Sequence, residues 1–209
     1  MTYTLYGDVG SGAICIEAIL AEAGVPYVWQ TVSLERNEQK SPAYLAINPS
    51  GKIPALRLPD GEIVTETAAL IVLLAERHPA ANLLPPPGAP ERAQALRWLA
   101  FMATEIYPFI EIGDYPERFV SAGEAEALRQ KAMERVRARM LQVEAAVAGP
   151  WFLASGFSAL DLYAVMFSRW RECKGWRERH LPKLCALFAA ICKRPSAGKV
   201  WAKHFGGGD

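Results

Sequence analysis

Two neighbouring stretches, NPSGKIPAL at residues 48–56 and TETAAL at residues 65–70, decide the fold of this chain. The segment 53–58 has the composition of a short strand and opens on an Ile-Pro pair. A cis X-Pro bond has a modest energetic cost, and folds accept it where they need a tight turn. A cis Pro54 at the start of this strand therefore makes physical sense.

A hairpin and a helix follow this strand. The sequence PDG at residues 59–61 is typical of a turn, so residues 62–64 should pair back antiparallel. A helix is then predicted over residues 65–78, because its apolar side chains recur at helical spacing and Pro79 ends it. The two stretches thus indicate strand, strand and helix.

Upstream of these stretches the pattern is strand, helix and strand. Residues 2–6 are predicted as a strand, residues 11–23 as a helix and residues 27–32 as a second strand, with a short helical piece at 42–46 further on. Such a unit places its two strands parallel, joined by a right-handed crossover. The first part of the chain therefore reads βαβ followed by ββα.

The character of the chain changes at residues 80–90, whose PPPGAP core can sustain neither a helix nor a sheet ladder. We interpret this segment as a linker between a first domain at residues 1–79 and an all-helical domain at residues 91–209. Helices are predicted at 91–113, 123–147, 158–174 and 182–193. The third is the best marked, because Ser158 and Asp161 resemble a capping box.

Composition excludes several classes of protein. The 23 basic and 22 acidic residues leave a formal charge of +1, whereas proteins that bind nucleic acid usually carry a basic face. The N-terminus lacks the pattern of a signal peptide, and no apolar run is long enough to span a membrane. The four cysteines form no short CxxC pair, so we interpret them as reduced thiols of a cytoplasmic protein. We expect neither a nucleic-acid nor a membrane partner.

Taken together, these features resemble the cytosolic glutathione transferase superfamily. The shared features are the βαβ unit, the Ile-Pro that opens the third strand, the acidic and hydroxyl residues at the next helix start, and the FSALD helix start at residues 157–161. The resemblance spans nearly the whole chain. It implies a thioredoxin-like α/β domain before an all-α domain, glutathione as co-substrate, an apolar electrophile as second substrate, and a homodimer that acts in detoxification.

The resemblance assigns parts of glutathione to residues of the first domain. The N–H and C=O of Ile53, exposed by the turn at Pro54, would pair with the cysteinyl part in the manner of an added strand. Thr67 would bind the γ-glutamyl carboxylate and Glu66 its ammonium group, at a helix start that favours a carboxylate. As residue types, Glu66 and Thr67 are also ordinary helix-start residues. Two loop residues are further candidates, for the glycine carboxylate: Gln39 and Lys40.

The catalytic hydroxyl is sought in the loop DVGSGAIC at residues 8–15. A thiol with a pKa of about 8.5 is largely protonated at neutral pH, and a hydroxyl that donates to sulfur at a helix N-terminus favours the thiolate. Read in register with the family, Ser11 falls where serine-type enzymes carry this hydroxyl, and Gly12 falls where cysteine-type enzymes carry their cysteine. Ser11 also fits a plain helix cap, and Tyr6 is the second candidate hydroxyl, within a strand. Cys15 is expected to be a small buried residue rather than a redox group.

The pocket for the second substrate is predicted from residue type, because aromatic side chains with a polar edge suit an apolar electrophile. The candidates are Tyr107, Phe109, Tyr115, Phe119, Trp170 and Trp176. We prefer Tyr107, since Pro108 should break the helix there and bend the chain.

Two classes of function stay open. The first is an enzyme that transfers glutathione to an electrophile, and isomerisation, dehalogenation or peroxide reduction would share its thiolate step. The second is a protein that binds glutathione or another ligand without turnover. Metal catalysis is not expected, because His78, His180 and His204 show no ligand spacing.

Overall fold

The computed structural model describes residues 2–170 and 174–206. These residues divide into two compact units. One unit comprises the described residues of Met1–Pro86 together with those of Ala189–Asp209, and the other comprises those of Pro87–Phe188.

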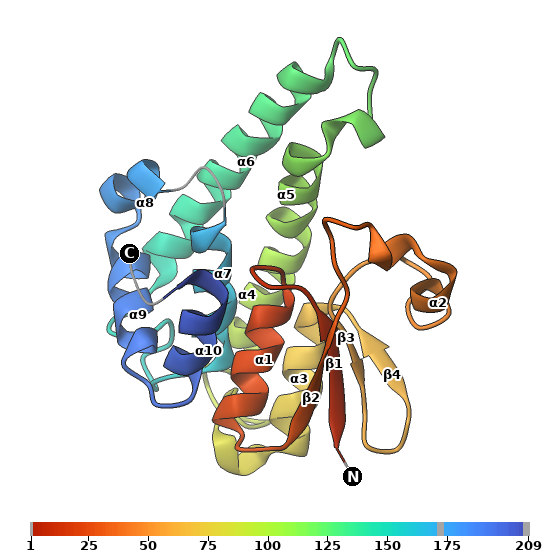
Figure 1. Ribbon diagram of the computed structural model, residues 1–209. Coiled ribbons are helices and arrows are strands. Elements are labelled where there is room, and N and C mark those ends of the chain that lie inside the picture. The colour runs from red at the N-terminus through yellow and green to blue at the C-terminus, as the bar shows by residue number, and fades with distance from the viewer. Residues whose placement is uncertain (1, 171–173, 207–209) are drawn as a thin grey trace. The chain divides into compact units, whose positions relative to one another are not determined.

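The first unit is built on a four-stranded mixed sheet (Figure 1). Its strands are β1 (Tyr3–Gly7), β2 (Tyr27–Thr31), β3 (Ala55–Arg57) and β4 (Ile63–Thr65), in the spatial order β2-β1-β3-β4. β1 and β2 are parallel, whereas β3 is antiparallel to both β1 and β4. The predicted order of βαβ and then ββα is confirmed, and the unit has the thioredoxin-like fold.

Helices cover both faces of this sheet. They are α1 (Ala13–Glu22), α2 (Pro42–Leu45), α3 (Thr67–Arg77) and α10 (Ala197–Phe205). Tyr6 and Ala55 form a core cluster with Tyr44 of α2 on one face. Because neighbouring strand residues point to opposite faces, Leu5 and Leu56 face the other side, where α1 and α3 lie, and both are fully buried.

The strand register gathers several chain segments at one end of the sheet. Tyr6 pairs with Ala55, and Ala55 pairs with Thr65. The residues after Tyr6, before Ala55 and after Thr65 therefore leave the sheet at the same end, where α1 and α3 also begin. A helix N-terminus carries unsatisfied N–H groups and the positive end of the helix dipole. Two of them at one end of a sheet suit an anionic ligand.

The second unit is helical in its described residues, apart from an isolated β-bridge between Leu153 and Gly156. Its helices are α4 (Arg92–Glu105), α5 (Tyr107–Asp114), α6 (Ala125–Ala146), α7 (Ala159–Arg169), α8 (Lys174–His180) and α9 (Pro182–Cys192), the last of which crosses the boundary between the units. As expected, the predicted helix at 91–113 is interrupted beside Pro108. Across the described ranges, no helix combines the length and the apolar composition needed to cross a bilayer.

The start of α7 carries the predicted capping box. The carboxylate of Asp161 accepts hydrogen bonds from the N–H of Ser158 at 2.6 Å and from the N–H of Phe152 at 2.7 Å. Asp161 is fully buried, and this burial raises its pKa to about 6 although the hydrogen bonds lower it. The side chain therefore fixes the segment before α7 to the helix itself.

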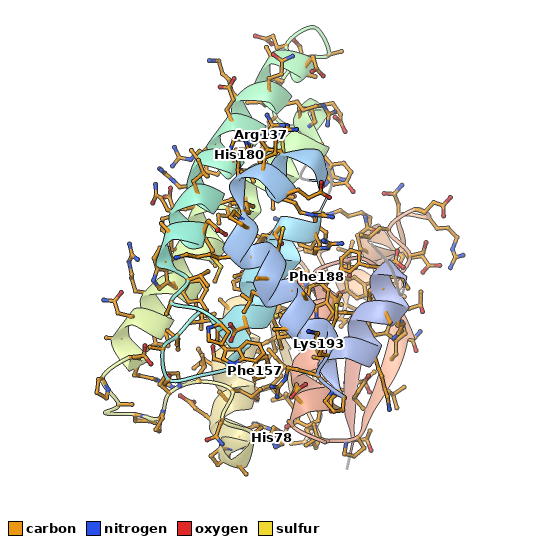
Figure 2. All side chains as sticks on the ribbon, turned by 90° about the vertical axis from the view of Figure 1, so that its left-hand side faces the viewer. His78, Arg137, Phe157, His180, Phe188 and Lys193 are labelled. Carbon is orange, nitrogen blue, oxygen red and sulfur yellow. The ribbon has the colours of Figure 1, made fainter. Side chains whose placement is uncertain are left out.

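The sequence patterns did not predict α8, and the predicted helix at 158–174 ends at Arg169, with residues 171–173 outside the described part. Trp176 makes one ring contact within α8 and one contact with α6. The ring of Trp176 stacks on His180 with 5.1 Å between centroids, and the guanidinium of Arg137 on α6 lies 5.9 Å from the Trp176 ring. Figure 2 labels Arg137 on α6 and His180 at the end of α8.

α10 was also not predicted, and the described residues from 189 to 206 belong to the first unit, which differs from the expected domain division. Glu22 at the end of α1 explains this placement. Its carboxylate accepts from the guanidinium of Arg194 at 2.6 Å and from the N–H of Ala197 at 3.0 Å, which is the first residue of α10. α10 then packs along α1.

Candidate active site

The loop before β3 is held by two side chains, Asn48 and Tyr44. The amide of Asn48 donates to the C=O of Lys52 at 2.7 Å and accepts from the N–H of Ser50 at 3.1 Å and from its hydroxyl at 2.8 Å. The hydroxyl of Tyr44 donates to the same Lys52 carbonyl at 2.8 Å, and burial raises the pKa of Tyr44 to about 12, so it stays a donor. The NPSGK sequence thus builds a closed turn that leads into Ile53.

The peptide bond between Ile53 and Pro54 is cis, as predicted. Ile53 is half-buried and precedes the first residue of β3 by two positions. In the part of the chain that the structure describes, no group forms a hydrogen bond with its N–H or its C=O. Both backbone groups are therefore available to a ligand that binds in an extended conformation.

Glu66 and Thr67 lie where β4 leads into α3. Glu66 has φ +67° and ψ 107°, a conformation that residues with a side chain rarely adopt and that tends to occur at functional sites. Glu66 is exposed, and Thr67 is buried as the first residue of the helix. Over residues 2–170 and 174–206, neither side chain has a hydrogen-bond partner.

Gln39 and Lys40 lie in a short 3-10 helix against the NPSGK loop. Gln39 is 5% exposed, and its Oε1 has no hydrogen-bond partner among the described groups. Lys40 Nζ donates to the C=O of Ser50 over a long distance of 3.4 Å. Gly51 has φ +60°, and a Cβ there would lie 3.0 Å from the backbone C=O of Gln39, so both the conformation and the space favour glycine. A buried amide and a loosely held cation therefore lie beside the loop.

Ser11 is part of a tight turn between β1 and α1. Its N–H donates to the C=O of Asp8 at 3.1 Å, and Gly10, the third residue of the turn, has φ +75°, which a type II turn requires there. The Ser11 hydroxyl donates to the same carbonyl at 2.6 Å and accepts from the N–H groups of Asp8 at 3.2 Å and Ala13 at 3.3 Å. Its oxygen thus contributes to capping α1, and its hydrogen points to Asp8.

Other groups near the start of α1 have different surroundings. The N–H of Gly12 has no partner in the described ranges. Cys15 is fully buried, as expected, and this burial raises the pKa of its thiol, which disfavours a reactive thiolate. Tyr6 is buried within β1, and its hydroxyl accepts from Arg57 at 3.3 Å. Ser11 and Gly12 therefore remain the polar groups at the helix start itself.

Comparison with known proteins agrees with this geometry. Residues 16–77 match the family described as glutathione S-transferase, N-terminal domain. The chain is 29% identical, over 96% of its length and 97% of the relative, to the uncharacterized GST-like protein YncG from Escherichia coli strain K12. A crystal structure of a glutathione transferase homolog from Sulfitobacter, with bound glutathione, matches with a TM-score of 0.89 and 30% identity, covering 97% of this chain and 98% of that one. The chain belongs to the glutathione transferase family. A maleylacetoacetate isomerase from Pseudomonas aeruginosa is 40% identical over 84 residues, which is 39% of each chain.

In this glutathione transferase family member, two of the aromatic candidates lie together. Tyr107 begins α5, and its ring lies 5.4 Å from the ring of Trp170, which follows α7. Phe167 contacts both rings, at 5.3 Å from Tyr107 and 5.6 Å from Trp170. These three rings form one aromatic cluster of the second unit.

The remaining aromatic candidates lie apart from this cluster. Phe109 is two positions after Tyr107 and thus on another face of α5, where the guanidinium of Arg135 lies 4.4 Å from its ring. Tyr115 follows α5, is 37% exposed, and has the guanidinium of Arg118 at 3.8 Å. Phe119 is 53% exposed. Trp176 lies in α8, where its ring contacts His180 of the same helix and Arg137 of α6. Residue type alone could not separate these positions.

The three histidines have partners within the fold. His78 forms a hydrogen bond with the hydroxyl of Tyr3 at 2.9 Å, His180 stacks on Trp176, and His204 forms a hydrogen bond with Glu17. In the described ranges, no cluster of three or more His, Cys, Asp or Glu side chains is arranged to hold a metal ion.

Sequence reasoning missed two residues that build the Ser11 turn. Asp8 accepts from the N–H of Val9 at 2.9 Å and from the N–H of Leu34 at 2.8 Å, and so joins the loops after β1 and β2. An Asp directly after a strand and before a glycine turn is a signal that could have been used. His204 accepts from the N–H of Gly10 at 3.0 Å across 194 residues of sequence, a contact that no local pattern predicts.

Proposed function

We propose that this protein binds glutathione at the end of the sheet where α1 and α3 begin, and activates its thiol for transfer to an apolar electrophile. One observation carries the proposal: the pairing of Tyr6 with Ala55 and of Ala55 with Thr65, which gathers the Ser11 turn, the unpaired backbone of Ile53 and the strained Glu66. The family membership supports it, and the Sulfitobacter homolog was crystallised with glutathione.

The γ-glutamyl end of glutathione would bind at the start of α3. Its carboxylate would accept hydrogen bonds from the hydroxyl of Thr67 and from the first N–H groups of the helix, which favour a negative charge. Its ammonium group would pair with the exposed carboxylate of Glu66. The cysteinyl part would bond to the N–H and C=O of Ile53, which places its sulfur toward the Ser11 turn.

The glycine end would bind beside the NPSGK loop. Lys40 carries a positive charge, and its long 3.4 Å bond to Ser50 is easily given up for a carboxylate. Gln39 presents a buried amide whose Oε1 lacks a partner among the described groups, which is costly unless a ligand or water satisfies it. The charge of Lys40 and the unsatisfied amide oxygen of Gln39 support these two residues as the site of the glycine carboxylate.

The thiolate would be stabilised at the start of α1 by the Ser11 hydroxyl and the Gly12 N–H. The hydroxyl hydrogen must turn from Asp8 to the sulfur, which exchanges one hydrogen bond for another worth about 1 kcal/mol or more. The Asp8 carbonyl stays bonded to the Ser11 N–H at 3.1 Å. The thiol releases its proton to water. The thiolate sulfur then forms a bond to the electrophilic carbon, and the leaving group departs with the electron pair of the bond that breaks.

The experiment combines retention on glutathione-agarose with turnover of an aryl halide. We expect Ser11→Ala to keep retention and to lose most of its turnover, because it removes only the donor to sulfur. Ser121→Ala, which removes an exposed hydroxyl of the second unit, is the matched control and should keep both. Failure of the wild-type protein to bind glutathione would overturn the proposal.

A glutathione-dependent isomerase is the second candidate, favoured by the 40% identity to the Pseudomonas aeruginosa isomerase over 84 residues. In such a reaction the thiolate adds to a double bond and leaves again, so glutathione is not consumed. Isomerisation of a maleyl compound without glutathione loss would identify it, whereas dehalogenation or peroxide reduction would consume glutathione. Retention without any turnover would instead indicate a glutathione-binding protein.

The family resemblance also leads us to propose a cytoplasmic homodimer. Light scattering coupled to size-exclusion chromatography tests the oligomeric state, and a mass corresponding to one 23.0 kDa chain would contradict it.

A further inference from the structure

A buried cluster joins α10 to α1 behind the Ser11 turn, within the first unit. At its centre is Glu17 of α1, which is 2% exposed. Its carboxylate accepts from the hydroxyl of Tyr27 at 2.9 Å and from Lys203 Nζ at 2.6 Å, and it lies 2.6 Å from His204 Nε2. Burial raises the pKa of Glu17, but hydrogen bonds from His204, Lys203 and Tyr27 outweigh it and leave the pKa lowered. The carboxylate therefore stays charged and accepting.

The ring of His204 connects this cluster to the turn. The N–H of Gly10 donates to His204 Nδ1 at 3.0 Å. Because an N–H can only donate, Nδ1 accepts, and the neutral ring carries its hydrogen on Nε2, where it donates to Glu17. The His204 side chain is 0% exposed, and the ring of Trp29 lies edge-on at 5.4 Å. Glu17 and the surrounding packing thus determine both the tautomer and the orientation of the ring.

The Gly10 N–H belongs to the central peptide of the turn. In a type II turn this peptide is flipped relative to a type I turn, and the φ of +75° at Gly10 shows the flipped form. Glycine adopts either sign of φ at little cost, so the residue itself does not hold this orientation. The His204 ring accepts a hydrogen bond from the N–H of this flipped peptide, and the Ser11 hydroxyl bonds to Asp8 in the same turn.

We propose that His204 is a positioning residue, which holds the central peptide of the turn and through it places the Ser11 hydroxyl for the glutathione thiolate. The inference rests on the proposed role of Ser11. It makes α10 part of the support of the loop that follows β1.

Two substitutions separate the two hydrogen bonds of the ring. In His204→Asn, the side-chain oxygen can take the place of Nδ1 and accept from Gly10, while the bond to Glu17 is lost. In His204→Gln, the amide can reach the place of Nε2 and bond to Glu17, while the acceptor for Gly10 is lost. We expect His204→Gln to lower kcat about 3- to 10-fold, as loss of one hydrogen bond implies, with little change in KM for glutathione.

The pH profile distinguishes positioning from stability. We expect the thiolate absorbance of bound glutathione in His204→Gln to titrate up to about one pH unit higher than in the wild type, in line with a tenfold effect. His204→Asn should stay close to the wild type in kcat and in this titration. His78→Gln is the matched control, because His78 forms its hydrogen bond with Tyr3, at the opposite end of β1 from the Ser11 turn. Figure 2 labels His78 at the end of α3.

The outcomes separate this inference from the proposed function. If Ser11→Ala loses turnover but His204→Gln leaves the titration of the bound thiol unchanged, the role of His204 is overturned and that of Ser11 stands. A defect in His204→Asn without one in His204→Gln also overturns the role of His204. Full turnover in Ser11→Ala overturns the role of Ser11, whatever His204 does. If His204→Gln does not fold, hydrogen exchange of backbone amides in the wild-type protein tests the inference instead. We expect the Gly10 amide to be as protected as the amides of α1, and rapid exchange of Gly10 would overturn the inference.

Discussion

Replacing Asn48 by alanine should weaken both the fold and glutathione binding, because this side chain organises the loop before Ile53. The substitution removes the donor to Lys52 and the acceptor for two groups of Ser50. Ser50 is exposed, so water replaces its bonds at little cost, whereas the bond from the 4% exposed Asn48 to Lys52 is lost outright. We expect the free energy of unfolding to fall by about 1–2 kcal/mol, and urea denaturation measures it.

The affinity for glutathione should fall with it. In the variant, glutathione must order the loop on binding, and an ordering cost of about 1.4 kcal/mol corresponds to a tenfold weaker dissociation constant in calorimetry. Tyr44→Phe is the matched variant, because it removes only the second donor to Lys52 and should give a smaller change in the same direction. A loss of stability with unchanged affinity would refute the link between this loop and the Ile53 backbone.

Three further predictions concern single residues. Glu66→Gly should raise the free energy of unfolding by up to about 1 kcal/mol in urea denaturation, because glycine adopts the φ of +67° without strain. The same change should weaken glutathione binding in calorimetry, and a gain in affinity would contradict the role of Glu66. Burial raises the pKa of Asp161 from an ordinary 3.8 to about 6, so the folded state binds its proton more tightly than the unfolded state. The free energy of unfolding should therefore fall between pH 3.8 and about 6 in the wild type relative to Asp161→Asn. Urea denaturation measures it, and the same pH dependence in both proteins would count against the prediction. Cys15 should resist a thiol-specific reagent in the native protein and react only on unfolding, as mass spectrometry of the labelled peptides can show; labelling of Cys15 in native protein would contradict its burial.

Features whose signal lies within a few residues could be predicted from the sequence. The cis Pro54, the hairpin after it and the capping box of Ser158 and Asp161 were all predicted, because turn residues and caps act on their immediate neighbours. α10 and its contacts were not. Glu22 meets Arg194, and His204 meets Gly10, only after the chain has folded back over nearly its whole length.

Within the site, residue types indicated the chemistry but not the geometry. The sequence identified Ser11 as a hydroxyl at a helix start, yet the direction of its hydrogen depends on the turn around Asp8 and Gly10. Likewise, the positive φ of Glu66 has no local signal, since the residue is not a glycine. Aromatic side chains in helices are common in cores and pockets alike, so Tyr107 could be separated from Phe109 only by their actual contacts.

The most direct test of the account is the pKa of the glutathione thiol in its complex with this protein, followed by the ultraviolet absorbance of the thiolate. We predict that the bound thiol in the wild-type protein titrates at least about one pH unit below free glutathione, and that Ser11→Ala moves it most of the way back while glutathione still binds. A bound thiol that titrates like free glutathione, or one that Ser11→Ala leaves unchanged, would contradict the account.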